Sequence, residues 1–173
     1  GPAIAGFYSL GLKILQVPIF IINSSLKKIF YQKCSEQYNK GIEIKSIYLS
    51  NTILLLAVSI FFSLLIILFS NNIISLFFDP EWLQITLYIK ILLIWWFVAF
   101  SNVPSLMVLH IFKKQKFILI FDIFLALSRI SVLVILSFFY SEIVALIGFS
   151  IIGMLFNSIL ILYTYRLVNR YSI

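Results

Sequence analysis

The stretch that decides the fold is 46–78, SIYLSNTILLLAVSIFFSLLIILFSNNIISLFF, in which 33 consecutive residues carry no charge. Two more charge-free stretches follow, 22 residues at 91–112 and 23 residues at 143–165. A helix needs about 20 apolar residues to cross a hydrocarbon layer of about 30 Å, so each stretch can span a membrane. Only helices and closed barrels satisfy backbone groups in lipid, and continuous apolar runs are not alternating barrel strands. The sequence therefore predicts an all-α, polytopic transmembrane helical bundle.

The composition supports the same class. Hydrophobic residues make up 62% of the chain and charged residues 11%, against roughly 25% charged in an ordinary soluble domain. We predict five spans, at about 4–30, 47–77, 82–111, 117–140 and 143–166. No linker or repeat divides them, so residues 1–173 form a single transmembrane domain.

Positive charges fall after alternate spans. The cations at these positions are Lys27, Lys28, Lys33, Lys40, Lys45, Lys113, Lys114, Lys116, Arg166 and Arg170. The other turns carry only Asp79, Glu81 and Glu142. Cytoplasmic loops hold an excess of Lys and Arg, which predicts an N-terminus outside and a C-terminus inside. The net charge of +7 then reflects topology and attraction to anionic lipid headgroups, and we expect no nucleic-acid partner.

The first span carries a polar stripe. Its members follow 4-3-7-4 spacing, which places them on one helix face: Ser9, Lys13, Gln16, Asn23 and Lys27. Such a stripe must face neighbouring helices or water. Lys13 lies about 20 Å of helix from Lys27, so one ammonium group must approach the membrane. Lys13 either faces an aqueous cavity or snorkels to the outer surface. Pro18 should kink this helix.

Arg129 is the most informative charged residue, because it lies near the middle of the fourth span. An isolated charge there costs about 3 to over 10 kcal/mol, so it should face protein or water. The functional interpretation is a cavity cation. The alternatives are snorkelling or an ion pair with Asp122, which lies seven residues earlier on the same face.

The other notable residues have weaker interpretations. Lys90 is either a cavity residue or an interfacial lysine, and Pro104 is expected to kink the third span. Gly148, Gly153 and Asn157 should allow close helix contact or interhelical hydrogen bonds. No nucleophile–base pair or phosphate-binding glycine loop is present, and Cys34 is the single cysteine. We therefore expect no catalytic residue, no metal and no cofactor, and we expect that the chain is not an enzyme.

The order of these features resembles a known family. The segments that carry the resemblance are GFYSL at 6–10, QVP at 16–18, FYQKCSE at 30–36, FFDPEW at 77–82, YIKIL at 88–92, Pro104, and KKQK at 113–116 leading to Asp122 and Arg129. They look like the second lobe of O-antigen and polysaccharide flippases, which belong to the multidrug/oligosaccharidyl-lipid/polysaccharide exporter superfamily. The resemblance covers essentially the whole chain, through short motifs.

The resemblance implies a function and a set of partners. It implies that the complete protein moves undecaprenyl-diphosphate-linked oligosaccharides across the bacterial cytoplasmic membrane, for O-antigen, capsule or exopolysaccharide assembly. Its partners would be that substrate, membrane lipids, polysaccharide polymerase machinery and an N-terminal lobe. Only five spans are present, so we expect this chain to be the C-terminal portion of a longer protein. The alternatives are a multidrug or peptidoglycan-precursor exporter, or a membrane enzyme such as a polymerase or acyltransferase.

Overall fold

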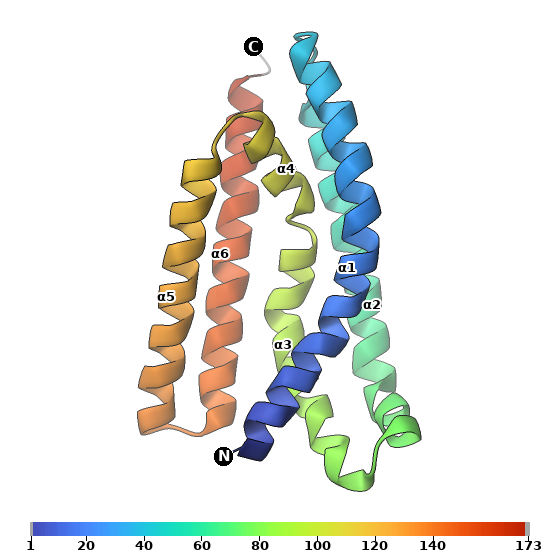
Figure 1. Cartoon of the computed structure of the whole chain (residues 1–173), viewed down its shortest axis with the longest axis vertical. Coiled ribbons are helices and arrows are strands. Elements are labelled where there is room, and N and C mark those ends of the chain that lie inside the picture. Colours follow the sequence, from blue (N-terminus) through green and yellow to red (C-terminus); the bar gives the residue numbers. More distant parts are fainter. Residues whose placement is uncertain (1, 172–173) are drawn as a thin grey trace.

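The structure, a computed structural model, describes the backbone of residues 2–171, and all side chains in that range except those of 2–5, 7, 8, 17–26 and 81. Within 2–171 all of its regular elements are helices, and none is a strand. The elements are α1 (Pro2–Asn39), α2 (Lys45–Phe77), the short 3-10 helix η1 (Pro80–Gln84), α3 (Ile85–Phe100), α4 (Val103–Ile111), α5 (Gln115–Phe139) and α6 (Glu142–Arg170). Figure 1 shows them as one elongated bundle. The predicted all-α class is confirmed.

Four helical segments of the described chain are long and apolar enough to cross a membrane: Lys45–Phe77, Trp82–Ile111, Gln115–Phe139 and Glu142–Arg170. They match the predicted spans at 47–77, 82–111, 117–140 and 143–166, and they indicate a membrane-embedded protein. The first predicted span, at 4–30, is helical but is not among the four. Its helix also continues beyond the predicted span, through 31–39. Five spans therefore stay a prediction.

The third predicted span is not one helix. Helix α3 ends at Phe100, residues 101 and 102 form a turn, and α4 begins at Val103. Pro104 is the second residue of α4, so the break at 101–102 lies directly before it. Pro104 has no amide hydrogen to donate to the Phe100 carbonyl across the break, and its role as a kink stays a prediction. Helix α1, in contrast, continues through Pro18, whose side chain lies outside the described residues.

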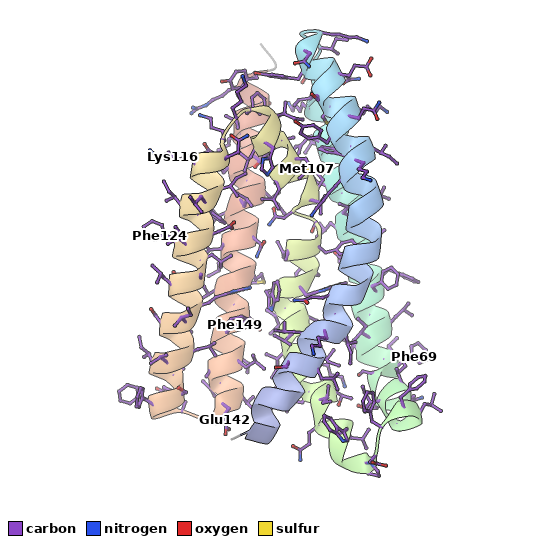
Figure 2. All side chains as sticks on the ribbon, in the orientation of Figure 1. Phe69, Met107, Lys116, Phe124, Glu142 and Phe149 are labelled. Atoms are coloured by element: carbon purple, nitrogen blue, oxygen red, sulfur yellow. The ribbon has the colours of Figure 1, made fainter. Side chains whose placement is uncertain are left out.

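The basic segments lie at the same end of the bundle. Figure 1 shows the α1–α2 turn, the α4–α5 turn and the end of α6 at the top, and the α2–η1 and α5–α6 turns at the bottom. We call the top the basic end. Lys116 at this end and Glu142 at the other are both visible in Figure 2. The predicted alternation of charge is thus a separation in space, although it does not fix which end faces the cytoplasm.

Two hydrophobic clusters hold the bundle together. The main core is the larger, and its buried members are Leu15, Leu55, Ile85, Tyr88, Ile89, Ile91, Leu92, Leu93, Trp96, Phe100, Val103 and Leu146. The basic-end core contains Phe30, Cys34, Ile44, Tyr48, Val108, Ile111 and Val168. Helix α3 packs against α1, α2 and α6. Helix α5 packs chiefly on α6, has no buried residue, and turns side chains such as Phe124 outward (Figure 2).

Aromatic and polar contacts fasten the basic end. The Phe112 ring lies 4.9 Å from the Tyr38 ring and 4.6 Å from the Tyr171 ring, centroid to centroid. Lys45 Nζ donates a hydrogen bond to Asn169 Oδ1 at 2.6 Å. These contacts join the α1–α2 hairpin, the α4–α5 turn and the end of α6. Burial of Cys34 in the basic-end core raises the pKa of its thiol to about 12.

The helices α1 and α4 end in the same way. After α1, Gly41 N–H bonds Tyr38 O and Ile42 N–H bonds Gln37 O. After α4, Lys113 N–H bonds His110 O and Lys114 N–H bonds Leu109 O. Both turns are Schellman motifs, which need one residue in the left-handed region. Gly41 adopts it at φ 70°, and Lys113 at φ 55°, where a side chain is strained.

Replacing Lys113 by glycine should therefore stabilise the protein. The gain expected is about 1 kcal/mol, because the left-handed penalty disappears and glycine's greater unfolded-state freedom offsets part of it. Reversible unfolding in detergent measures it. Lys113→Ala is the matched control, since it removes the same charge without relieving the backbone. Equal stability of the two variants would contradict the assignment of strain.

Candidate functional site

Arg129 lies near the middle of α5 and reaches across to two aromatic rings. Its guanidinium carbon Cζ is 4.3 Å from the centroid of the Trp95 ring and 4.4 Å from that of the Phe149 ring. Trp95 belongs to α3 and Phe149 to α6. Cation–π contacts of this kind are worth about 0.5–2 kcal/mol, more where water is excluded. The charge is therefore stabilised in part by ring faces from two other helices.

Gly153 makes room for this arrangement. It is buried on α6, one turn after Phe149. A Cβ added there would overlap Arg129 Nη2 and lie 2.6 Å from Cζ. The arginine side chain thus crosses the surface of α6 at the residue that has no side chain. Gly148, one helical turn and a half earlier, serves the close α5–α6 contact instead, because its added Cβ would meet Leu136 and Val132.

The structure directs Arg129 to the two rings, and the alternative of an Arg129–Asp122 ion pair stays a prediction. The ion pair seen at the exposed end of α1 is Lys40–Glu36, at 2.6 Å. Asp122 is exposed on α5. The Arg129 side chain extends sideways to Trp95 and Phe149.

The polar stripe of α1 faces away from the bundle. Gly11 and Leu15 are buried, and a Cβ added at Gly11 would contact Ile89 and Leu92 of α3. Lys13 and Gln16 are exposed, as are Ser9 and Lys27. The predicted common face is therefore present for these four residues. Asn23, the remaining member, has a side chain outside the described residues.

Lys90 takes an intermediate position. It is half-buried on α3, between Ile89 and Ile91 of the main core. Lys13, Lys90 and Arg129 thus come from α1, α3 and α5 and differ in exposure. Arg129 lies between the Trp95 and Phe149 rings, which together with Gly153 we call the aromatic cradle. Lys13 lies on an exposed face. The three cations therefore do not line one common cavity.

Sequence reasoning missed a layer of buried hydrogen bonds beside the α3–α4 break. Asn102 Nδ2 donates to Asn157 Oδ1 at 2.6 Å and to Asn157 O at 3.1 Å. Asn157 Nδ2 in turn donates to Gly153 O at 2.7 Å. The expectation that Asn157 bonds between helices is confirmed. Its partner could have been suspected from Ser101–Asn102, the polar pair within an otherwise apolar run.

Tyr48 belongs to the same layer. Its hydroxyl donates to Ile161 O at 3.0 Å and lies 3.1 Å from Ser105 Oγ. It joins α2 to α4 and α6. No spacing rule marks a single tyrosine in the apolar run of α2, so this role could not be predicted from the sequence.

No family model, curated protein or solved structure matches this chain. The resemblance to flippases therefore stays a prediction that rests on its short motifs. Among the described residues, no group of three or more His, Cys, Asp or Glu side chains could hold a metal ion.

We predict that Gly153→Ala displaces the Arg129 guanidinium, because the added methyl group and Nη2 cannot occupy the same place. The variant should lose about 1–2 kcal/mol of stability, the value of the cation–π contacts. A double-mutant cycle with Arg129→Ala measures the coupling. In the Arg129→Ala background, Gly153→Ala should cost almost nothing.

Gly6→Ala is the matched control. A Cβ added at Gly6 meets no atom within 4 Å, so this change should be neutral or stabilise α1 by up to about 1 kcal/mol. If Gly153→Ala lowered the free energy of unfolding no more than Gly6→Ala does in the presence of Arg129, the Arg129 guanidinium would not lie against Gly153.

Proposed function

We propose that this chain is the C-terminal lobe of a bacterial flippase for undecaprenyl-diphosphate-linked oligosaccharides. The observation that carries the proposal is the exposed stripe of Ser9, Lys13 and Gln16 on the face of α1 that points away from α3. A lysine and a glutamine within an apolar span need water or protein beside them. The resemblance to flippases implies an anionic diphosphate substrate with a polar sugar. Such a substrate needs a hydrated path with positive charge, which the stripe could provide.

The proposal assigns different tasks to the two cations. Lys13 is exposed and can approach a phosphate as a point charge. Arg129 holds its Nε and Nη2 atoms out of solvent and lies between two rings. Its task is to fix α5 relative to α3 and α6. Substrate contact thus belongs first to Lys13, with Gln16 and Lys90 as neighbours of the path.

The membrane arrangement is part of the proposal. It places five spans in the cytoplasmic membrane, with the N-terminus outside and the basic end inside. The clustering of the basic turns at one end of the bundle supports this orientation, since basic loops are retained in the cytoplasm. An N-terminal lobe would supply the opposite wall of the path, and alternating access would follow from rocking of the two lobes.

Cysteine accessibility tests the orientation. In a Cys34→Ala background, a cysteine replacing Ile42 should react with a membrane-impermeant maleimide only after the cells are permeabilised. A cysteine replacing Tyr140 should react in intact cells. Both positions are exposed, so access depends on the side of the membrane. The reverse labelling pattern would invert the proposed topology.

Complementation tests the function. Within the complete gene product, Lys13→Ala should restore O-antigen or capsule to a flippase-deleted strain at least about tenfold less well than wild type, because the lost contact is a charge-assisted one. Protein levels should be unchanged, since Lys13 packs against nothing in the bundle's interior. Lys116→Ala, which removes an exposed lysine of the basic end, is the matched control.

The outcomes separate the alternatives. Wild-type levels of surface polysaccharide with Lys13→Ala would remove this lysine from the path. Failure of the wild-type gene to complement, together with increased drug resistance when it is overproduced, would favour a multidrug exporter.

A further inference from the structure

The two hydrophobic cores of the bundle share no residue, and polar side chains lie near their boundary. Asn102 lies on the main-core side of this boundary, and Tyr48 is itself a member of the basic-end core. These side chains bond across helices, Asn102 with Asn157, and Tyr48 with Ser105 and the Ile161 carbonyl. We call this set of hydrogen-bonded side chains the polar layer. Close-packed apolar cores resist bending, while a layer of hydrogen bonds can exchange partners.

Proline weakens the main chain in two helices at this layer. Pro104 cannot donate to the Phe100 carbonyl, and the Ser101 and Asn102 amides bond only three residues back, to Val98 and Ala99. In α1, Pro18 cannot donate to the Ile14 carbonyl. Helix α1 runs beside α3 in this region, because Trp96 Nε1, five residues before the break, donates at 2.8 Å to Leu15 O, three residues before Pro18. Missing main-chain bonds of this kind are where helices kink.

Helices α2 and α6, which also contribute to both cores, carry side-chain bonds to their own backbone at this layer. In α2, Thr52 Oγ1 donates to Tyr48 O at 2.8 Å. In α6, Asn157 Nδ2 donates to Gly153 O at 2.7 Å. Such bonds allow a helix to bend, and others of the same kind occur elsewhere in α6, at Ser158 and Thr164. The position of the hinge is therefore given by the α3–α4 break, and α2 and α6 can bend beside it.

From this arrangement we propose that the polar layer is a hinge, about which the basic-end core tilts relative to the main core. Asn102 and Asn157 form its pivot. The Asn102 Oδ1 atom is buried and has no hydrogen-bond partner among the described residues, so the amide has an acceptor to spare for a second arrangement. Ser150 Oγ, buried on the same helix as Asn157, is in the same state. Bistable packing around a few helix-end residues is a common basis of domain motion.

Asn102 Oδ1 and Ser150 Oγ could instead be ligands of a monovalent cation bound at the break. The positive charge of a nearby arginine opposes such a site. Gly153, whose carbonyl accepts from Asn157, packs directly against the Arg129 guanidinium. A second positive charge so close to the first would be repelled. The hinge is independent of the proposed substrate, because it is a property of the bundle alone.

Distance measurements between spin labels test the hinge in the full chain, in lipid nanodiscs and a Cys34→Ala background. One pair of labels replaces Ile42 at the tip of the α1–α2 hairpin and Phe138 at the far end of α5, which are 52% and 80% exposed. This pair crosses the polar layer, so its distance distribution should show two populations. The control pair, Leu83 and Phe138, lies wholly at the opposite end and should show one.

Restoring a main-chain donor should stiffen the hinge. Pro104→Ala and Pro18→Ala, each alone, should lower the second population about fivefold, the equilibrium value of one net hydrogen bond. Either variant suffices if the other does not fold, as judged by its circular dichroism. Pro80→Ala is the matched control and should change nothing, because Pro80 begins η1 and interrupts no helix.

Two results would overturn the proposal. A single narrow population for the Ile42–Phe138 pair in the wild type would show that the cores do not tilt. Two populations that persist unchanged in both folded proline variants would show that the motion does not use the break.

Discussion

The break between α3 and α4 interrupts the backbone hydrogen bonds of an apolar segment, and side chains supply hydrogen bonds around it. A continuous helix in apolar surroundings satisfies its backbone by itself. At the break, Ser101 Oγ donates to the Phe97 and Val98 carbonyls and Asn102 Nδ2 donates across to α6. The break therefore brings polar side chains into the interior of the bundle.

The second constraint is the charge on α5. A helix that packs chiefly on one neighbour would otherwise be held only by apolar contacts with α6, including the stacked rings of Phe117 and Tyr163. Arg129 adds a link to α3 through the Trp95 ring. The link is possible only because α6 presents a glycine at the crossing point. One small residue and one large cation thus determine how the outermost helix is placed.

Much of the fold could be predicted from hydropathy, and little of the site. Apolar run length located α2, α5 and α6 to within a few residues, and the alternation of lysines anticipated the basic end. Run length placed the third span at 82–111, in agreement with the candidate span Trp82–Ile111. It does not detect the break at 101–102, because side chains supply hydrogen bonds there. The partners of Arg129 could not be predicted, since Trp95, Phe149 and Gly153 meet only in three dimensions. The Asp122 pairing followed from helix spacing alone and ignored competing ring faces.

The burial of Cys34 has a consequence for the chemistry of the whole chain. Thiols react with oxidants and disulfides as thiolates, and a thiol whose pKa is about 12 is almost entirely protonated at neutral pH. Cys34 is also the single cysteine of the sequence and is closed in by Phe30, Ile44 and Val168 of the basic-end core. Burial and the raised pKa both disfavour the thiolate, so Cys34 is poorly placed to react with oxidants or to exchange disulfides.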